Sequence, residues 1–214
     1  MKKPLFIAFE GIDGSGKSTQ SLILADRLRQ EGLNVHSTFE PSKGPVGSMI
    51  RNILKGETQM DERTIAGLFV ADRLDHILNG ENGLLKMLNE GNHVITDRYY
   101  FSSYAYHACH MDMEWVIQAN SMSAELLRPT ATFFIDVTAE ECMRRILAGR
   151  KGTERYESLE NLEEVRKNYL KAFTLLEQQE KIIFIDGMAD EKAVSESVWK
   201  KLKEILEKEY PELL

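Results

Sequence analysis

The chain has 214 residues, a length that corresponds to a single domain at about 150 residues per domain. Its hydrophobic fraction of 43% and charged fraction of 29% exclude a disordered composition, and its two cysteines exclude a disulfide framework. The formal net charge of −7 argues against a nucleic-acid binder, and no apolar run reaches the roughly 20 residues that span a bilayer. We therefore expect a cytoplasmic protein that has no nucleic-acid or membrane partner.

Five short runs rich in branched or aromatic residues predict buried strands. Longer stretches with helical spacing lie between these runs, which span residues 5–10, 34–39, 93–97, 132–137 and 181–186. Because near-continuous apolar strands alternate with helices, we predict an α/β fold, a doubly wound sheet of five parallel strands flanked by helices. The basic segment 149–157 (GRKGTERYE) contains two glycines and indicates a short mobile lid within one domain over residues 1–214.

Residues 11–18 (GIDGSGKS) fit the phosphate-loop pattern G-x-x-x-x-G-K-[ST] in full, between the first predicted strand and a helix from Lys17. Glycines allow successive N–H groups to converge on phosphate oxygens, and the helix N-terminus adds partial positive charge. Lys17 is expected to bridge the β- and γ-phosphates of ATP, and the Ser18 hydroxyl to ligate Mg²⁺. The pattern predicts a P-loop NTPase-type fold; a glycine-rich turn without a ligand is the much less frequent alternative.

A P-loop alone does not separate a kinase from other nucleotide-binding proteins. A GTP switch protein should carry a guanine-reading [NT]-K-x-D segment, which this sequence lacks, whereas a kinase needs a second anion site. Asp97 and Arg98 close the third predicted strand. Asp97 could hold a Mg²⁺-bound water if that strand neighbours the first, and Arg98 could grip a phosphate with two bonds. The alternative for this pair is an ion pair at a strand end.

Two helical faces carry groups suited to a nucleobase. Ser103, Tyr106 and His107 share one face at spacings of three and four residues, with Ser102 stacked on Tyr106. On a second helix, predicted over residues 61–79, a phenylalanine and an arginine four apart (Phe69 and Arg73) face the same way. A solvated or capping histidine, a core phenylalanine and a surface arginine remain the alternatives.

In order and spacing, these segments resemble the thymidylate kinase family over nearly the whole chain. The resemblance is carried by the phosphate loop with its acidic Asp13, by Glu40-Pro41, by the segment around Arg51, by residues 68–73, by residues 97–106, by residues 154–157 at the end of the lid and by residues 185–187. It implies transfer of the γ-phosphoryl group of ATP to dTMP with Mg²⁺ as cofactor, by a homodimer. A kinase of another nucleotide, or an ATP-binding switch with little turnover, is the alternative.

The resemblance also implies roles for individual residues. Arg98 and Arg51 would hold the dTMP phosphate, Phe69 would stack on thymine, and Arg73 and Ser103 would bond the base edge. Asp13 would hold the sugar 3′ side, and Tyr106 would lie under C2′. The implied dTMP-binding residues are Asp13, Glu40, Pro41, Arg51, Phe69, Arg73, Arg98, Ser102, Ser103, Tyr106 and His107. His107 stands where many relatives have a glutamine.

The remaining implied residues hold ATP, the metal and the transferred group. The ATP-binding residues are Gly11, Ile12, Asp13, Gly14, Ser15, Gly16, Lys17, Ser18, Thr19 and Arg145 (with Arg144 as the alternative to Arg145), and the metal-binding residues are Ser18 and Asp97, the latter through water. The catalytic residues are Lys17, Arg98, Asp13, Asp97 and Arg150. One branch of the family has a phosphate-loop arginine where Gly14 stands here, so a lid cation must replace it. Arg150 is the first choice, followed by Arg155 and Lys151.

Overall fold

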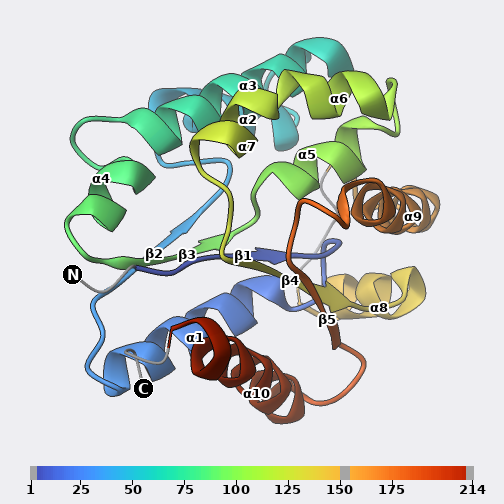
Figure 1. Ribbon diagram of the computed structural model, residues 1–214. Coiled ribbons are helices and arrows are strands. Elements are labelled where there is room, and N and C mark those ends of the chain that lie inside the picture. The colour runs from blue at the N-terminus through green and yellow to red at the C-terminus, as the bar shows by residue number, and fades with distance from the viewer. Residues whose placement is uncertain (1–3, 150–154, 211–214) are drawn as a thin grey trace.

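The computed structural model describes residues 4–149 and 155–210, which form a parallel sheet between two layers of helices (Figure 1). Five strands pair in the order β2-β3-β1-β4-β5, and every pairing is parallel. The strands are β1 (Phe6–Glu10), β2 (Val35–Phe39), β3 (His93–Asp97), β4 (Ala131–Asp136) and β5 (Ile182–Asp186). The predicted fold class and all five predicted strands are confirmed, with strand ends that differ by one residue at most.

The described helices cover both faces of the sheet, as a doubly wound fold requires. Helices α1 and α10 lie on one face, and α2, α3, α5 and α9 lie on the other (Figure 1). The helices are α1 (Lys17–Gln30), α2 (Pro45–Leu54), α3 (Glu62–Leu78), α4 (Leu84–Asn89), α5 (Tyr100–His107), α6 (Met113–Ala119), α7 (Ser121–Leu126), α8 (Ala139–Gly149), α9 (Leu159–Leu176) and α10 (Glu191–Glu209). Among the described helices, none combines the length and apolar character needed to cross a membrane.

Local sequence signals fix where several helices begin. Asp61, Asp112, Ser158 and Asp190 precede α3, α6, α9 and α10, and each side chain accepts a hydrogen bond from a backbone N–H in the first helical turn. Such N-caps satisfy donors that would otherwise lack partners. Helix α5 has no side-chain cap of its own at Tyr99, so its N-terminal donors need a partner from elsewhere in the fold.

The strand order brings the functional segments together. Strand β1 is buried at every residue because β3 and β4 flank it and helices cover both of its faces. The phosphate loop leaves its carboxyl end, and the β1–β3 register pairs Phe9 with Asp97. Asp97 and Arg98 therefore emerge beside the phosphate loop, which meets the condition that the sequence set for them.

Candidate active site

The phosphate loop connects β1 to α1 through a backbone that only glycine adopts readily. Gly14 and Gly16 have φ values of +81° and +93°, in the left-handed region. A Cβ at Gly14 would also lie 2.6 Å from the carbonyl oxygen of Cys142 on α8. A side chain at position 14 is therefore disfavoured by the backbone conformation and by the clash with α8. These two effects explain why this loop carries no arginine at that position.

Lys17 folds back over the loop that it follows. Its side chain is buried, and its Nζ lies 3.5 Å from the carbonyl oxygen of Ile12 and 3.5 Å from Oδ1 of Asp13. Both contacts are long for an ammonium group, so the three N–H donors of Lys17 have capacity left for phosphate oxygens. The Lys17 ammonium group thus lies at the phosphate loop with donors free for an anion, and its contact with the β- and γ-phosphates stays a prediction.

Ser18 and Asp97 lie together at the start of α1. The Ser18 hydroxyl donates to Oδ2 of Asp97, while Oδ1 of Asp97 is buried without a partner among the described residues. A hydroxyl and a carboxylate with a free oxygen suit Mg²⁺, which uses oxygen ligands and takes few of them from the protein. Within residues 4–149 and 155–210 no group of three His, Cys, Asp or Glu side chains could hold a metal alone. A Mg²⁺ ion held here would therefore take further ligands from nucleotide phosphates.

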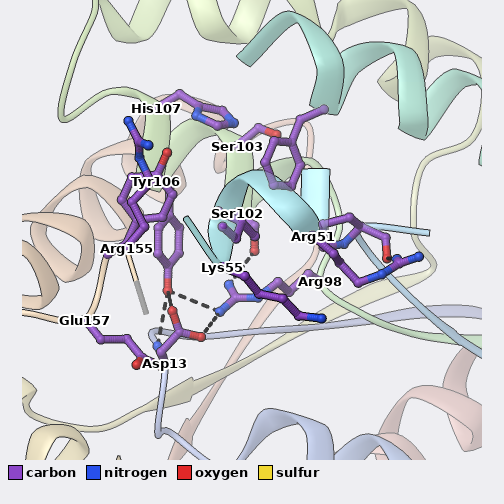
Figure 2. Close-up of a pocket in the computed structure, with 14 residues that line it drawn as sticks. Asp13, Arg51, Lys55, Arg98, Ser102, Ser103, Tyr106, His107, Arg155 and Glu157 are labelled. Atoms are coloured by element: carbon purple, nitrogen blue, oxygen red, sulfur yellow. Dashed lines mark hydrogen bonds and ion pairs between the residues drawn. The ribbon is translucent and has the colours of Figure 1, made fainter. Parts of the chain in front are cut away.

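Arg98 links the phosphate loop to the neighbouring pocket (Figure 2). Its Nη2 donates to Oδ1 of Asp13 at 2.5 Å and to the Tyr106 hydroxyl at 3.1 Å, and that hydroxyl donates to Oδ2 of Asp13 at 2.9 Å. Burial raises the pKa of Asp13, but the charges of Arg98 and Lys17 outweigh it and hold the pKa well below its ordinary value. Asp13 is therefore an anion at neutral pH, fixed between two cations and a hydroxyl.

The pocket beside Arg98, here called the acceptor pocket, has a volume of about 270 Å³, close to the lower end for small-molecule sites. Cationic side chains line it at Arg51, Lys55, Arg98 and Arg155, and apolar or aromatic side chains line it at Leu54, Phe69, Tyr106 and Tyr156. Ser102, Ser103, His107, Asp13, Pro41 and Glu157 complete the lining. An aromatic ring joined to an anion matches this combination of surfaces.

The aromatic part of the acceptor pocket includes a buried histidine. His107 packs its ring against Phe69 with centroids 5.0 Å apart, and its Nδ1 is buried without a partner among the described residues. Burial, with a smaller effect of Arg73, lowers the pKa of His107 to about 3, so the ring is neutral at pH 7. The solvated alternative does not hold for His107, because its side chain lies in the pocket wall.

Arg73 and Glu40 lie behind the acceptor pocket and do not line it. The Arg73 guanidinium is 1% exposed and lies 2.6 Å from Oε2 of Glu40. It also donates to the Ser103 hydroxyl at 3.0 Å and to Oδ1 of Asn120 at 2.5 Å. Arg73 is thus no surface cation, and in this structure it supports Ser103 from behind the pocket.

Arg51 approaches the acceptor pocket from α2. Its Nη1 donates to the carbonyl oxygen of Pro41 at 2.9 Å and to that of Ser42, and its Nη2 donates to the Ser48 hydroxyl at 2.8 Å. These partners are all neutral, so the positive charge of Arg51 is not compensated by an ion pair among the described residues. Its charge remains available to an anion in the pocket.

A second pocket lies on the other side of the phosphate loop, with a volume of about 420 Å³. Ser15, Gly16 and Thr19 line it, together with Arg144, Arg145 and residues 187–191. Arg145 is fixed across it, since Nη2 donates to the carbonyl oxygen of Gly187 at 2.9 Å and Nη1 to that of Ser15 at 3.4 Å. Arg144 is 68% exposed and among the described residues pairs only with Glu141, so Arg145 is the more firmly held of the two cations predicted to lie against adenine.

Residues 155–157, the described end of the predicted lid, line the acceptor pocket. Arg150 and Lys151 lie outside the described residues. Arg155 pairs with Glu62 on α3 at 2.6 Å, and the Tyr156 hydroxyl donates to the same carboxylate at 2.7 Å. Both side chains also line the pocket, so their contacts with Glu62 connect this segment to α3 at the pocket.

Sequence reasoning overlooked several residues of the site. Lys55 and Tyr156 line the acceptor pocket, and Glu10 and Tyr169 lie directly behind Arg98. Glu10 carried a signal, since it is an acid at the end of a buried strand. Tyr169 carried none, because its contact with Glu10 joins residues 159 positions apart.

A parallel sheet with a phosphate loop at the end of its central strand, beside a Mg²⁺-compatible Ser–Asp pair, defines a P-loop nucleotide-binding protein. The model of the thymidylate kinase family matches residues 9–198. A probable thymidylate kinase of Pyrococcus horikoshii is 40% identical, over 78% of this chain and 81% of the relative. A thymidylate kinase of Desulfotalea psychrophila is 38% identical, over 74% of this chain and 77% of the relative. A probable thymidylate kinase of Methanococcus aeolicus is 34% identical, over 95% of this chain and 96% of the relative. The chain belongs to the thymidylate kinase family.

Proposed function

We propose that this protein transfers the γ-phosphoryl group of ATP to dTMP, giving dTDP and ADP. One observation carries the proposal: Arg98 lines the acceptor pocket while its Nη1 also lies 3.4 Å from the carbonyl oxygen of Gly11 in the phosphate loop. A phosphate held by Arg98 in the acceptor pocket therefore lies next to a phosphate held by the loop. Two such phosphates are what an in-line transfer requires.

The reaction needs positioning and charge compensation rather than a strong base. The acceptor phosphate of dTMP is largely a dianion at pH 7, because the second pKa of a phosphate monoester is about 6. Its oxygen attacks the γ-phosphorus, the new P–O bond forms, and the bond to the β,γ-bridging oxygen breaks and leaves ADP. Arg98 and Arg51 orient the attacking phosphate, while Lys17 and the phosphate-loop N–H groups stabilise charge on the donor side.

Mg²⁺ bound with ATP would supply further positive charge on the donor side of the reaction. Ser18 and Asp97 are proposed as its protein contacts, directly for the hydroxyl and through water for the carboxylate. The free, buried Oδ1 of Asp97 supports this proposal. Phe69 is proposed to stack on thymine, Ser103 and His107 to face its edge, and Tyr106 to lie under the deoxyribose.

We further propose that the protein is a cytoplasmic homodimer and that one domain over residues 1–214 carries the activity, with residues 149–157 as its lid. Large apolar side chains on α3, α6 and α7 support self-association, namely Leu78, Trp115, Met122 and Leu126, which are 52%, 49%, 58% and 39% exposed. Light scattering during gel filtration tests the homodimer, which has twice the 24.5 kDa mass of the chain.

An ADP-release assay with a panel of acceptors tests the proposed function. With dTMP as acceptor we expect ADP to form at least about tenfold faster than with dCMP, dGMP, dAMP or dUMP, and only slowly without any acceptor. Preference for another monophosphate would instead assign the protein to a different nucleotide. ATP binding with the same slow turnover under every condition would favour the switch protein.

A further inference from the structure

The carboxyl group of Glu10 lies behind the acceptor pocket at the end of β1 and is fully buried. Its Oε1 accepts hydrogen bonds from the backbone N–H groups of Tyr99 at 2.8 Å and Ser102 at 3.1 Å. Tyr99 is the N-cap residue of α5 and Ser102 lies in its first turn, and the helix has no side-chain cap of its own. Glu10 therefore caps α5 from a neighbouring strand and fixes the chain immediately after Arg98.

The second oxygen of Glu10 sets the direction of two hydroxyl groups. Oε2 accepts from the Ser102 hydroxyl at 2.6 Å and from the Tyr169 hydroxyl at 2.7 Å. Each hydroxyl has a single proton, so an oxygen that donates to Glu10 turns its lone pairs away from the carboxylate. Those oxygens lie 2.9 Å and 3.5 Å from Nη1 of Arg98. The two hydroxyl oxygens also lie 2.8 Å apart, and as long as both protons point to Glu10 both hydroxyls are acceptors for the guanidinium.

The backbone and side-chain conformation of Arg98 depends on hydrogen bonds from its surroundings. Its φ of +73° lies in the left-handed region, which residues with a side chain rarely adopt, so its surroundings must hold it there. On one side, Nη2 is held by Asp13 and Tyr106, two residues of the site itself. On the other side, Nη1 is held by the hydroxyl groups of Ser102 and Tyr169, which donate to Glu10. The protein itself therefore fixes the guanidinium from two directions.

Tyr169 ties this arrangement to α9, the helix that follows the lid in the chain. Its side chain is fully buried, and its ring packs against Phe134 with centroids 5.1 Å apart and against Phe173 at 5.8 Å. These rings fix where the hydroxyl lies, with little freedom to adjust. Tyr169 therefore offers its hydroxyl at a set point between the Glu10 carboxylate and Arg98.

We propose that Glu10 and Tyr169 are positioning residues for the acceptor phosphate, which act by holding the Arg98 guanidinium in the orientation that grips dTMP. The inference rests on the proposed function, since it concerns the phosphate of that substrate. Neither residue lines the acceptor pocket, so neither contacts the substrate itself. Their effect must therefore pass through Arg98.

Tyr169→Phe tests the proposal, because it removes the hydroxyl and keeps the ring packing. We expect the Kd and KM for dTMP to rise about tenfold and the KM for ATP to change less than twofold. Tyr100→Phe is the matched control. Tyr100 is equally buried, and its hydroxyl donates to Glu180 at 2.8 Å, away from the site. This control should lose a similar amount of thermal stability and keep the dTMP constants of the unmodified protein.

A double-mutant cycle with Arg98→Lys tests whether the effect passes through the guanidinium, with dTMP binding measured by calorimetry. In that background we expect Tyr169→Phe to change the dTMP Kd less than threefold. Glu10→Gln, which removes the negative charge and keeps the size of the side chain outside the pocket, should show the same coupling and serves if Tyr169→Phe does not fold. A tenfold effect that persists in the Arg98→Lys protein, or dTMP constants equal to those of Tyr100→Phe, would overturn the proposal. An unmodified protein that neither binds nor phosphorylates dTMP would instead refute the proposed function.

Discussion

Among single residues, two arginines show how differently a cation can serve one site. Arg73 contacts Glu40, Ser103 and Asn120, and of these three residues Ser103 lines the acceptor pocket. The Arg98 side chain is 15% exposed, lines the pocket and contacts the phosphate loop. Both have their charges compensated by a carboxylate, but only Arg98 can exchange part of that contact for a substrate phosphate.

Lys17→Ala is expected to abolish phosphoryl transfer while the fold persists. We propose that the Lys17 ammonium group, which lies at the phosphate loop, binds the β- and γ-phosphates, so its loss should remove transition-state stabilisation of about 3–4 kcal/mol or more. Steady-state kinetics with circular dichroism as a folding check would measure this. Turnover within about tenfold of the unmodified protein would contradict the role of Lys17.

Substitutions at the two ends of the acceptor pocket should separate phosphate binding from base binding. Arg98→Ala should raise the dTMP KM and lower turnover, together by about 10²-fold or more, because the grip on the phosphate also aligns it. Phe69→Ala should raise the dTMP KM by about tenfold and leave turnover at saturation nearly unchanged. If Arg98→Ala alters the ATP KM alone, Arg98 belongs to the donor side.

The buried His107 should make the free energy of unfolding decrease as the pH falls. The pKa of about 3 in the fold lies below the ordinary 6.5, so between these values the unfolded chain binds a proton that the folded chain does not. Stability from this group is therefore complete above pH 6.5 and declines as the pH falls. Between pH 7 and pH 5 the loss is about 2 kcal/mol.

Urea unfolding at pH 7 and pH 5 would measure that contribution. His107→Gln should reduce the difference in unfolding free energy between the two pH values by about 2 kcal/mol, since glutamine does not titrate. Equal differences for the two proteins would mean that the imidazole is protonated in the fold near its ordinary pKa.

Secondary-structure elements divide clearly into those that local sequence predicts and those that it does not. The strands were predictable to one residue because apolar runs ending in an acid mark a buried parallel strand, as in β1 and β3. Helix α3 begins after its N-cap residue Asp61, in agreement with the helix predicted over residues 61–79. Each of these signals lies within a few residues of the element that it defines.

The start of α5 and the face of α9 could not be predicted in the same way. Helix α5 takes its cap from Glu10, 89 residues away, and α9 turns Tyr169 toward that same carboxylate. The burial of Arg73 likewise depends on Glu40, which lies 33 residues earlier in the chain. Such contacts follow from the packing of the whole sheet and its helices, so no local pattern contains them.

The lid should supply the cation that the phosphate loop lacks. Gly14 excludes a side chain, yet the γ-phosphoryl group spreads its charge over three oxygens during transfer. We expect Arg150→Ala to lower turnover by about 10²-fold or more and to change dTMP affinity little. Arg155→Ala is the comparison, because Arg155 is paired with Glu62 and should show the smaller loss. Unchanged turnover in both variants would place the compensating charge outside the lid.

Across the whole molecule, the strand order explains how one sheet edge serves two substrates. Strand β1 carries the phosphate loop, its neighbour β3 carries Asp97 and Arg98, and β2 leads to Pro41 and the acceptor pocket. The donor side and the acceptor side thus meet where β1 and β3 end, as in other sheets that bind ligands at the carboxyl ends of their strands. The order of strands was not itself predictable from five apolar runs.

The central claim is that a phosphoryl group passes directly from ATP to dTMP on this protein. The most direct measurement is the fate of the label when γ-³²P-ATP, Mg²⁺ and dTMP are incubated with the protein and the nucleotides are separated by ion exchange. The account predicts label in dTDP in equal amount to the ADP formed, and none with Lys17→Ala. Label released as inorganic phosphate, with no labelled dTDP, would contradict it.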